Sequence, residues 1–300
     1  MFREKKGRWD ILWCNKCDLS NIAYLKAAKV GGFDRIIIHS HNSYNMYTGL
    51  KFYIKQIIHY INKFSVEKYV TDFWACSDYA AEWLFPVKVM NEDKVCYIPN
   101  AVDTDIYRFD KELRSRKCKQ LSVKNNFVIG YIGRLTTQKN PKYALEIFNE
   151  IYKKNNNALF MIAGTGDLES SIRSEVESLE CNNAVRFLGS RNDVPELMQA
   201  MDVLLLPSLY EGLPVVAVEA QAAGLPIFAA SDGITSQVKI TDYLHFLKLS
   251  DGYEAWANEI MSSDLTRRDC SEEIKKSGFD IREASKKLDG MFKMQRISGD

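Results

Sequence analysis

The feature that most constrains the fold is a regular alternation of short apolar runs and amphipathic stretches between residues 127 and 229. The apolar runs have the length of buried strands, and they are 127–132, 158–163, 185–188, 203–206 and 226–229. Between them lie segments of helical length, one of which opens with Asn140-Pro141, a pair suited to a helix start. Strands that alternate with helices at this spacing predict a parallel, doubly wound α/β sheet.

The residues before this region show a looser form of the same pattern. Strands are expected at 10–14, 35–39, 73–77 and 95–98, with helices between them. The stretch 108–124 is rich in charge and holds no long apolar run, so it predicts the connection and leading helix between two domains. A last helical pattern covers 281–294.

Composition narrows the class of protein. The net charge of +1 gives no general reason to expect a nucleic-acid partner. No apolar run approaches the roughly 20 residues that a membrane-spanning helix needs. Seven scattered cysteines predict free thiols in a reducing compartment, and therefore the cytoplasm. Redox or zinc use of Cys14 and Cys17 is an alternative, but two unrelated small buried residues explain that pair more simply.

One predicted helix, over residues 50–69, has a pronounced apolar stripe. Isoleucines and a phenylalanine recur at helical spacing, and four lysines lie off the stripe. We expect this helix to pack its stripe on a sheet and to leave the lysines in water. The alternative is a basic amphipathic helix that lies on an anionic membrane.

The stretch 203–224 carries the clearest functional signal. The strand 203–206 ends at Pro207, Pro214 suits the first position of a helix, and Gly224 suits the residue after its end. Glu211 then lies in the loop at the carboxyl end of a strand, and Glu219 lies inside the helix. Ligands of open α/β sheets bind at such edges, where a helix N-terminus offers free amides to phosphate. Two carboxylates that flank those amides suit the hydroxyl groups of a sugar nucleotide.

The pattern Glu211-Gly-Leu-Pro, followed by four residues and Glu219, resembles the signature of retaining glycosyltransferases with the GT-B fold. The wider stretch resembles the glycogen-synthase-like family that builds bacterial capsule and exopolysaccharide. The resemblance implies an α/β, GT-B architecture of two Rossmann-like doubly wound domains. It assigns 1–107 to an acceptor-side domain, 108–280 to a nucleotide-sugar-binding domain, and 281–300 to a helix that crosses back to the first domain. Family members usually carry further strands before the region matching 39–42, so we expect an incomplete first domain.

A transferase of this kind must stabilise the diphosphate that leaves, with positive charge or oriented amides. Arg134 and Lys139 lie in the loop after the strand 127–132, and Gly133 would allow a ligand to approach the backbone closely. Two exposed surface cations are the alternative reading of these residues. The family has matching residues at both positions, which favours the functional reading.

The resemblance also implies roles for other residues of the second domain. Glu211 would bind hydroxyl groups of the transferred sugar, and Glu219 those of the ribose. The remaining donor-binding residues that the resemblance implies are Gly164, Gly166, Arg186, Leu188, Gly212, Leu213, Pro214, Val215 and Val216.

In the first domain, His41 is the best candidate for a catalytic residue, because it follows a buried strand and could support charge near the anomeric carbon. His39 alternates with it and could instead be a core histidine. Asp103-Thr-Asp105 has the form of a metal–diphosphate motif of another glycosyltransferase fold. We expect these acids to cap a turn, and we expect neither a metal nor another cofactor.

The predicted function is transfer of a hexose or N-acetylhexosamine, with retention, from a nucleotide-sugar, with UDP the expected nucleotide. The expected acceptor is a lipid-linked saccharide in capsule or exopolysaccharide synthesis, met at the inner face of the plasma membrane. Two alternatives stay open: an epimerase or phosphorylase of the same fold, and a protein that binds nucleotide-sugar with little turnover because its first domain is truncated.

Overall fold

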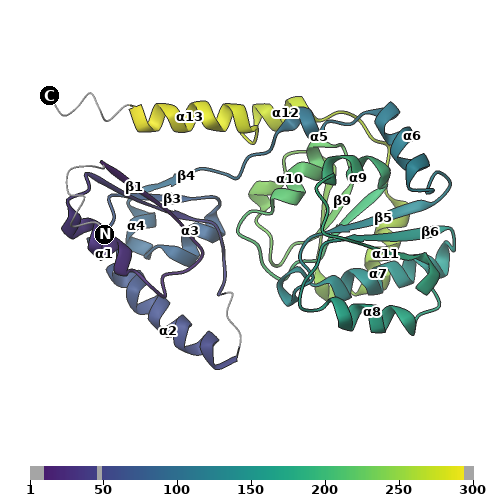
Figure 1. Ribbon diagram of the computed structural model, residues 1–300, viewed down its shortest axis with the longest axis horizontal. Helices are drawn as coiled ribbons and strands as arrows, with labels where there is room; N and C mark the ends of the chain where they lie inside the picture. Colours follow the sequence, from purple (N-terminus) through teal and green to yellow (C-terminus); the bar gives the residue numbers. More distant parts are fainter. Residues whose placement is uncertain (1–9, 46–48, 294–300) are drawn as a thin grey trace. The chain divides into compact units, whose positions relative to one another are not determined.

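The computed structural model describes residues 10–45 and 49–293 of the chain (Figure 1). The chain divides into two compact units. The first unit comprises Met1–Asn100 and Glu211–Leu213, and the second comprises Ala101–Tyr210 and Pro214–Asp300. The sequence places the boundary at residue 107, whereas Ala101–Tyr107 belongs to the second unit, where helix α5 packs against α9, α10 and α12.

The first unit contains a four-stranded parallel sheet in the order β1-β2-β3-β4. Its strands are β1 (Ile11–Lys16), β2 (Arg35–Ser40), β3 (Asp72–Ala75) and β4 (Val95–Tyr97). Its helices are α1 (Ala23–Gly31), α2 (Gly49–Ser65), α3 (Asp78–Leu84) and α4 (Val87–Asn91). The central strands β2 and β3 are buried on both faces, and this explains the apolar runs 36–38 and 73–75 within them.

The second unit contains a six-stranded parallel sheet in the order β10-β9-β8-β5-β6-β7. Its strands are β5 (Phe127–Ile132), β6 (Ala158–Ala163), β7 (Val185–Gly189), β8 (Val203–Leu206), β9 (Ile227–Ala230) and β10 (Leu244–Leu247). The chain builds outward from β5 through β6 to β7, and then returns to β8 on the other side of β5. The reversal places a topological switch point between β5 and β8.

Helices cover both faces of this sheet (Figure 1). One layer contains α7 (Pro141–Lys154), α8 (Glu169–Glu177) and α11 (Tyr253–Ser262). The other contains α5 (Thr104–Tyr107), α6 (Lys111–Gln120), α9 (Val194–Ala200), α10 (Val215–Ala222) and α12 (Ser271–Lys276). The helix α13 (Ile281–Lys293) ends the described chain.

The core of the second unit follows directly from the apolar periodicity of the sequence. In α7, the side chains at Ala144, Ile147, Phe148 and Ile151 are fully buried against the sheet. Phe148 stacks on Phe160 of β6 with ring centroids 5.1 Å apart. Apolar burial of this kind contributes about 25 cal/mol per Å² of surface removed from water and holds the helix layer on the sheet.

The two parallel sheets confirm the predicted α/β class, and the five predicted strands of the second unit are all present. Four elements are not apparent from the sequence: the short helices α4, α5 and α12 and the edge strand β10. The apolar residues of β10 are interrupted by His245 and followed by Lys248. The crossing of the terminal helix to the first domain stays a prediction. All seven cysteines are free, and Cys17 is exposed, so the expectation that Cys14 and Cys17 are both buried is wrong.

The preferred interpretation of the helix over 50–69 is also wrong. The structure forms this helix as α2, but its apolar stripe does not pack on the sheet: Ile57, Ile61 and Phe64 are 61%, 63% and 81% exposed. The only fully buried side chain of α2 is the polar His59. Within residues 10–45 and 49–293, every helix is too short or too polar to cross a lipid bilayer.

Candidate functional site

The loops that follow β5, β6 and β8 meet at the carboxyl edge of the second sheet. The three strands are neighbours, with β5 in the centre. The switch point between β5 and β8 is the position at which ligands bind in open α/β sheets, because the connections there leave a crevice. This edge holds most of the residues that the sequence predicts to bind a donor.

Two glycines join the loop after β5 to the loop after β6. A Cβ atom at Gly164 would lie 1.9 Å from the carbonyl oxygen of Gly133, and one at Gly166 would lie 2.4 Å from that of Leu135. Backbone hydrogen bonds from Gly133 to Ala163 (3.0 Å) and from Leu135 to Thr165 (2.9 Å) reinforce this contact. Glycine at 164 and 166 is therefore required by close backbone approach, and φ of 140° at Gly164 adds to the requirement.

The buried side chain of Gln138 joins the loop after β5 to the loop after β8. Its amide nitrogen donates to the carbonyl of Tyr210 at 3.0 Å, and its own backbone carbonyl accepts from Leu209 at 2.8 Å. Its side-chain oxygen accepts from Arg134 at 3.4 Å. One residue thus fixes the spacing of the two loops and orients a cation beside them.

Arg134 and Lys139 supply the positive charge at this edge. The hydroxyl group of Tyr131 donates toward the backbone carbonyls of both residues, at 3.0 and 3.4 Å, and so fixes the two ends of the loop. The exposed Arg134 pairs with no carboxylate in the described part of the chain. At Gly133 an added Cβ would make only ordinary contacts, the nearest at 3.8 Å. Packing of the described protein therefore does not require glycine at 133.

The helix α10 begins directly after Pro214, and its first amides belong to Val215 and Val216. One turn further along, Glu219 accepts a hydrogen bond from the hydroxyl group of Tyr107 at 2.7 Å. Burial raises the pKa of Glu219, and the hydrogen bond from Tyr107 offsets part of that rise. The carboxylate is thus held in a defined orientation with its second oxygen available to another donor.

Two buried hydroxyl groups lie in the same loops. The side-chain oxygens of Thr136, after β5, and Ser208, after β8, have no hydrogen-bond partner among the described residues. A buried hydroxyl group without a partner is costly. Both groups could donate to a bound anion or hydroxyl, and neither was identified from the sequence.

The end of β7 also reaches this edge. Between the pairs Ile162–Phe187 and Ala163–Gly189 the register shifts, so Leu188 is an extra residue in a β-bulge. The amide of Gly164 donates to the carbonyl of Gly189 at 2.8 Å, which ties the bulge to the glycine loop. The side chain of Arg186 points elsewhere: it donates to the carbonyl of Leu121 at 2.6 Å, at the end of α6. Any role of Arg186 in donor binding would have to use its backbone.

The segment Glu211–Leu213 belongs to the first unit, whereas the residues that flank it belong to the second. The hydroxyl groups of Ser43 and Ser77 donate to the carbonyls of Glu211 and Gly212. A Cβ atom at Gly212 would lie 2.4 Å from the carbonyl oxygen of His41. Gly212 is therefore required for the segment to lie against the end of β2. Glu211 itself is buried, with 5% of its surface exposed.

His41 follows β2, and its ring nitrogens lie 3.1 Å from Asn100 Oδ1 and 2.8 Å from Asn15 Oδ1. Asn100 also donates to the carbonyl of Leu213 at 3.3 Å, so one asparagine contacts both His41 and the 211–213 segment. Burial lowers the pKa of His41, which favours a neutral ring.

His39 is a core histidine, which is the alternative that the sequence analysis gave for this residue. It is 3% exposed, and its ring packs against Trp13, Trp74 and His41. Burial, and next the electrostatic interaction with His41, lower its pKa to about 3.

The acids of the 103–105 motif have structural partners. Asp103 caps α5 by accepting the amide of Asp105 at 3.1 Å. Arg282 pairs with both acids, and Lys275 pairs with Asp105 at 3.4 Å. These contacts tie α5 to the C-terminal helices, which agrees with the expected role in capping a turn.

The structure therefore assembles the predicted residues in two groups. The second unit brings together the loops of Gly133, Arg134, Lys139, Gly164, Gly166 and Leu188 with the start of α10 and Glu219. The first unit brings together His41, Glu211, Gly212 and Leu213. Sequence reasoning missed the residues that position these groups: Gln138, Tyr107 and Asn100. Their contacts join segments distant in sequence, and no local pattern marks them.

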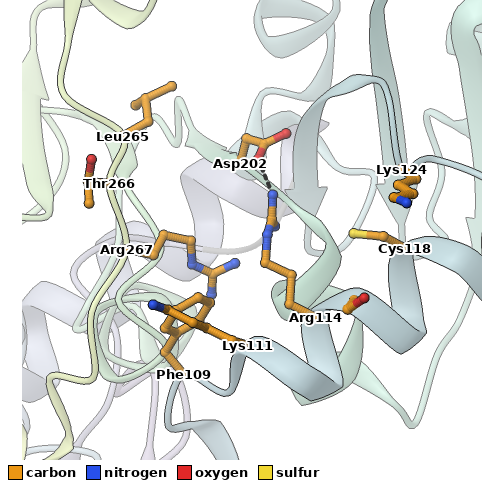
Figure 2. A pocket seen from close by; sticks show the side chains of 10 residues that line it. Phe109, Lys111, Arg114, Cys118, Lys124, Asp202, Leu265, Thr266 and Arg267 are labelled. Atoms are coloured by element: carbon orange, nitrogen blue, oxygen red, sulfur yellow. Dashed lines mark hydrogen bonds and ion pairs between the residues drawn. The ribbon is translucent and has the colours of Figure 1, made fainter.

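A separate basic cavity lies near the amino-terminal edge of the second sheet, beside Asp202, which precedes β8 (Figure 2). Its volume is about 470 Å³, and its lining includes Lys111, Arg114, Lys124 and Arg267. Arg114 pairs with Asp202 at 2.5 Å, and the half-buried Arg267 donates to five backbone carbonyls at the ends of α9 and α10. Both guanidinium groups are thus engaged in holding the C-terminal segment and the helix ends.

Comparison with known proteins agrees with the fold and the motif. Residues 114–277 match the family model described as glycosyl transferases group 1, and this match covers more than half of the chain. The chain therefore belongs to the glycosyl transferases group 1 family, a class of enzymes that transfer sugars.

Individual relatives are similar over parts of their length. The chain is 29% identical over 263 residues to the putative glycosyltransferase EpsF of Bacillus subtilis, covering 86% of this chain and 68% of that protein. It is 36% identical over 142 residues to the Escherichia coli UDP-Gal:α-D-GlcNAc-diphosphoundecaprenol α-1,3-galactosyltransferase, covering 46% of this chain and 37% of the relative. The second match thus spans little more than a third of the relative.

Among solved structures, Anabaena Alr3699/HepE in complex with UDP and glucose superposes with a TM-score of 0.77 at 19% identity. The superposition covers 94% of this chain and 77% of the HepE chain. At this identity the likeness concerns the fold, and it confirms the expected GT-B class.

Proposed function

We propose that this protein transfers a hexose or N-acetylhexosamine from a UDP-sugar to a lipid-linked saccharide, with retention at the anomeric carbon, in capsule or exopolysaccharide synthesis. We further propose that it acts in the cytoplasm at the inner face of the plasma membrane. The observation that carries this proposal is the switch-point edge of the second sheet, where Arg134, Lys139, the start of α10 and Glu219 are presented from adjacent loops.

The chemistry of that edge suits a nucleoside diphosphate-sugar. Negative charge develops on the diphosphate as the glycosidic bond to it breaks, and two cations with helix amides can stabilise that charge without a metal. The oriented carboxylate of Glu219 can accept hydrogen bonds from ribose hydroxyls. His41 and Glu211, held together in the first unit, are proposed to contact the transferred sugar.

The relatives support the finer parts of the proposal. The Escherichia coli relative is named for a UDP-galactose donor and a diphosphoundecaprenol-linked acceptor, and HepE was crystallised with UDP and glucose. Retention is proposed from the resemblance of the Glu211–Glu219 pattern to that of retaining enzymes.

The test is a transfer assay with the full chain, a panel of nucleotide-sugars and diphosphoprenol-linked saccharides. We expect UDP release that requires an acceptor, product with the anomeric configuration of the donor, and turnover unchanged by EDTA. Arg134→Ala should reduce turnover roughly 10²–10³-fold, the usual cost of removing one group that stabilises developing charge. Lys139→Ala should act in the same direction.

Two matched variants separate binding from folding. Arg116→Ala removes an exposed arginine of α6 and should leave transfer unchanged. Gly133→Ala should fold normally, because its Cβ makes only ordinary contacts, yet it should weaken UDP binding measured by calorimetry. Tight UDP binding without transfer to any acceptor would favour a binding protein, and donor conversion without acceptor would favour an epimerase. Either result would overturn the proposed transfer.

A further inference from the structure

The helix α2 exposes a continuous apolar face. We call it the outer face of α2, and its residues are Leu50, Tyr53, Ile54, Ile57, Tyr60, Ile61 and Phe64. Each of them is between 45% and 81% exposed. At about 100° per residue, they fill one arc of roughly 120° with no polar residue among them. An apolar surface as continuous as this usually marks a site of interaction.

The opposite face of α2 is mostly polar and packs on the first unit, where the rings of Phe52 and Tyr44 also meet with centroids 5.9 Å apart. His59 is buried: its Nδ1 accepts the amide of Leu19 at 3.0 Å, and its Nε2 donates to the carbonyl of Trp83 at 3.1 Å. Asn62 donates to the carbonyl of Leu19 at 2.7 Å, and Gln56 accepts from Asn45 at 2.8 Å. These directional contacts fix the rotation of the helix. The contacts of the inner face therefore hold the outer face toward solvent. Rotation of the helix about its axis cannot bury the outer face without breaking those contacts.

The charge of α2 has a single sign. Lys51, Lys55 and Lys63 lie on the helix, Lys68 follows it, and Gly49–Ser65 contains no acidic residue. Lys51 and Lys63 lie beyond the two ends of the apolar arc, and Lys55 lies nearer the inner face. Lys63 also donates to the carbonyl of Glu82 at 2.5 Å, whereas Lys51 is exposed and can extend along the border of the arc. An apolar face with aromatic residues and flanking lysines has the properties of a helix that lies in a membrane interface.

We propose that α2 binds the surface of an anionic lipid bilayer, with its outer face among the acyl chains and its lysines at the headgroups. This inference deepens the proposed function, since a lipid-linked acceptor would be reached at such a surface. The charge distribution favours lipid over a second copy of the chain. Two copies of α2 packed face to face would bring lysines together with no acid on either helix to pair with them, whereas anionic headgroups complement them.

The test measures binding of the full chain to vesicles by flotation, without donor or acceptor. We expect binding to vesicles of phosphatidylglycerol mixed with phosphatidylcholine and weaker binding to phosphatidylcholine alone. The double variant Ile57→Ser with Ile61→Ser should reduce binding at least about tenfold, because two large apolar side chains no longer enter the acyl region. Lys51→Gln should reduce binding to the anionic vesicles about fivefold, the usual contribution of one lysine near such a surface.

The matched control is the double variant Val87→Ser with Ile106→Ser. It removes two apolar side chains that are 68% and 56% exposed on α4 and α5, outside the outer face. It should bind vesicles like the wild type. All four changed positions are exposed, so the thermal unfolding midpoints of both double variants should stay near that of the wild type.

Three outcomes would overturn the proposal. The first is wild-type protein that does not float with anionic vesicles. The second is equal loss of binding in the control. The third is a dimer in sedimentation experiments that the Ile57→Ser, Ile61→Ser variant abolishes, without vesicle binding by the wild-type monomer.

The experiments distinguish failure of the membrane inference from failure of the proposed function. If the proposed function is wrong, vesicle binding without donor is unaffected. If the membrane inference alone is wrong, the wild-type protein does not float with anionic vesicles but still transfers sugar to a water-soluble acceptor analogue.

Discussion

The helices α2 and α7 have the same kind of sequence and opposite orientations. Both are amphipathic, with 17 and 14 residues, and both end in lysine-containing turns. In α7 the apolar side chains face the sheet and the charged ones face water. In α2 the polar side chains of His59 and Asn62 face the protein, and the apolar side chains face outward.

This difference shows what apolar periodicity does and does not determine. Apolar periodicity predicts that a helix has an apolar face, but the packing partners of the helix determine what covers that face. The apolar face of α7 is covered by the sheet of the second unit, through contacts such as the stacked rings of Phe148 and Phe160. For α2 the first unit offers a backbone amide and carbonyl groups that only polar side chains can satisfy.

The largest expected effect comes from equivalent truncations on the two apolar faces. Phe148→Ala in α7 should cost about 3–5 kcal/mol of unfolding free energy, because it removes a fully buried ring and leaves a cavity. Phe64→Ala in α2 should stay within about 0.5 kcal/mol, since that ring is 81% exposed. Hydrogen exchange followed by mass spectrometry, which reports each unit separately, measures both values. Similar costs for the two variants would mean that the outer face of α2 is covered in the free protein.

The next effect concerns the polar inner face of α2. His59→Leu keeps the bulk of the side chain but leaves the amide of Leu19 and the carbonyl of Trp83 without a partner. It should cost about 2–4 kcal/mol, because each unsatisfied buried group costs roughly 1–3 kcal/mol. The measurement is the exchange protection of amides in α2 and β2. His59→Gln, which retains an acceptor and a donor, should cost less, and a stabilised leucine variant would refute the assigned role.

The same histidine predicts a pH dependence opposite in sign to that of α7. Burial lowers the pKa of His59 to about 4, so the folded state resists protonation while the unfolded chain takes up a proton near pH 6.5. Stability from His59 is therefore present above pH 6.5 and is lost as the pH falls toward 4, by at most about 1.4 kcal/mol per pH unit. In α7, burial and nearby acids raise the pKa of Glu146, whose contribution to stability grows as the pH falls.

Exchange protection of α2 and α7 measured from pH 7 to pH 4.5 checks this contrast. His39 and His41 in the same unit also have lowered pKa values, so the informative quantity is the difference between wild type and His59→Gln. An unchanged pH profile in that variant would contradict the prediction.

The smallest expected effect concerns the start of α7. Asn140 precedes Pro141 with φ of 50°, a left-handed conformation that asparagine and glycine tolerate. Asn140→Ala should cost about 1 kcal/mol, whereas Asn140→Gly should change stability by only a few tenths. Urea denaturation of the two variants gives the difference, and equal stability would show that the left-handed conformation is not maintained.

The sequence predicts most of the second unit because its inner strands are buried on both faces. Runs such as 127–132 and 158–163 contain no charged residue and are mostly large apolar residues, and their observed bounds coincide with the predicted ones. Glycine and proline mark the ends of α10 for clear conformational reasons. The strand β10 was missed because four residues that include a histidine give too short a pattern.

The residues of the candidate site that belong to sequence motifs were predictable, whereas the residues that act through tertiary contacts were not. Glu219 was identified from its spacing to Glu211, but the hydroxyl of Tyr107 that orients it comes from more than a hundred residues away. Arg186 was expected to contact the donor through its backbone, and its side chain is held at the end of α6 by the carbonyl of Leu121. Neither contact has a local signature, because both depend on how helices pack across the sheet.

The contacts of Gly164, Gly166 and Gln138 have a consequence for the thermodynamics of recognition. They join the loops after β5, β6 and β8 through groups that belong to the protein itself. An incoming nucleotide therefore meets a surface whose shape already exists, and little of its interaction energy is spent on restricting chain motion. Preorganisation of this kind places the determinants of affinity in the charges and hydroxyls that line the surface rather than in the ordering of the loops.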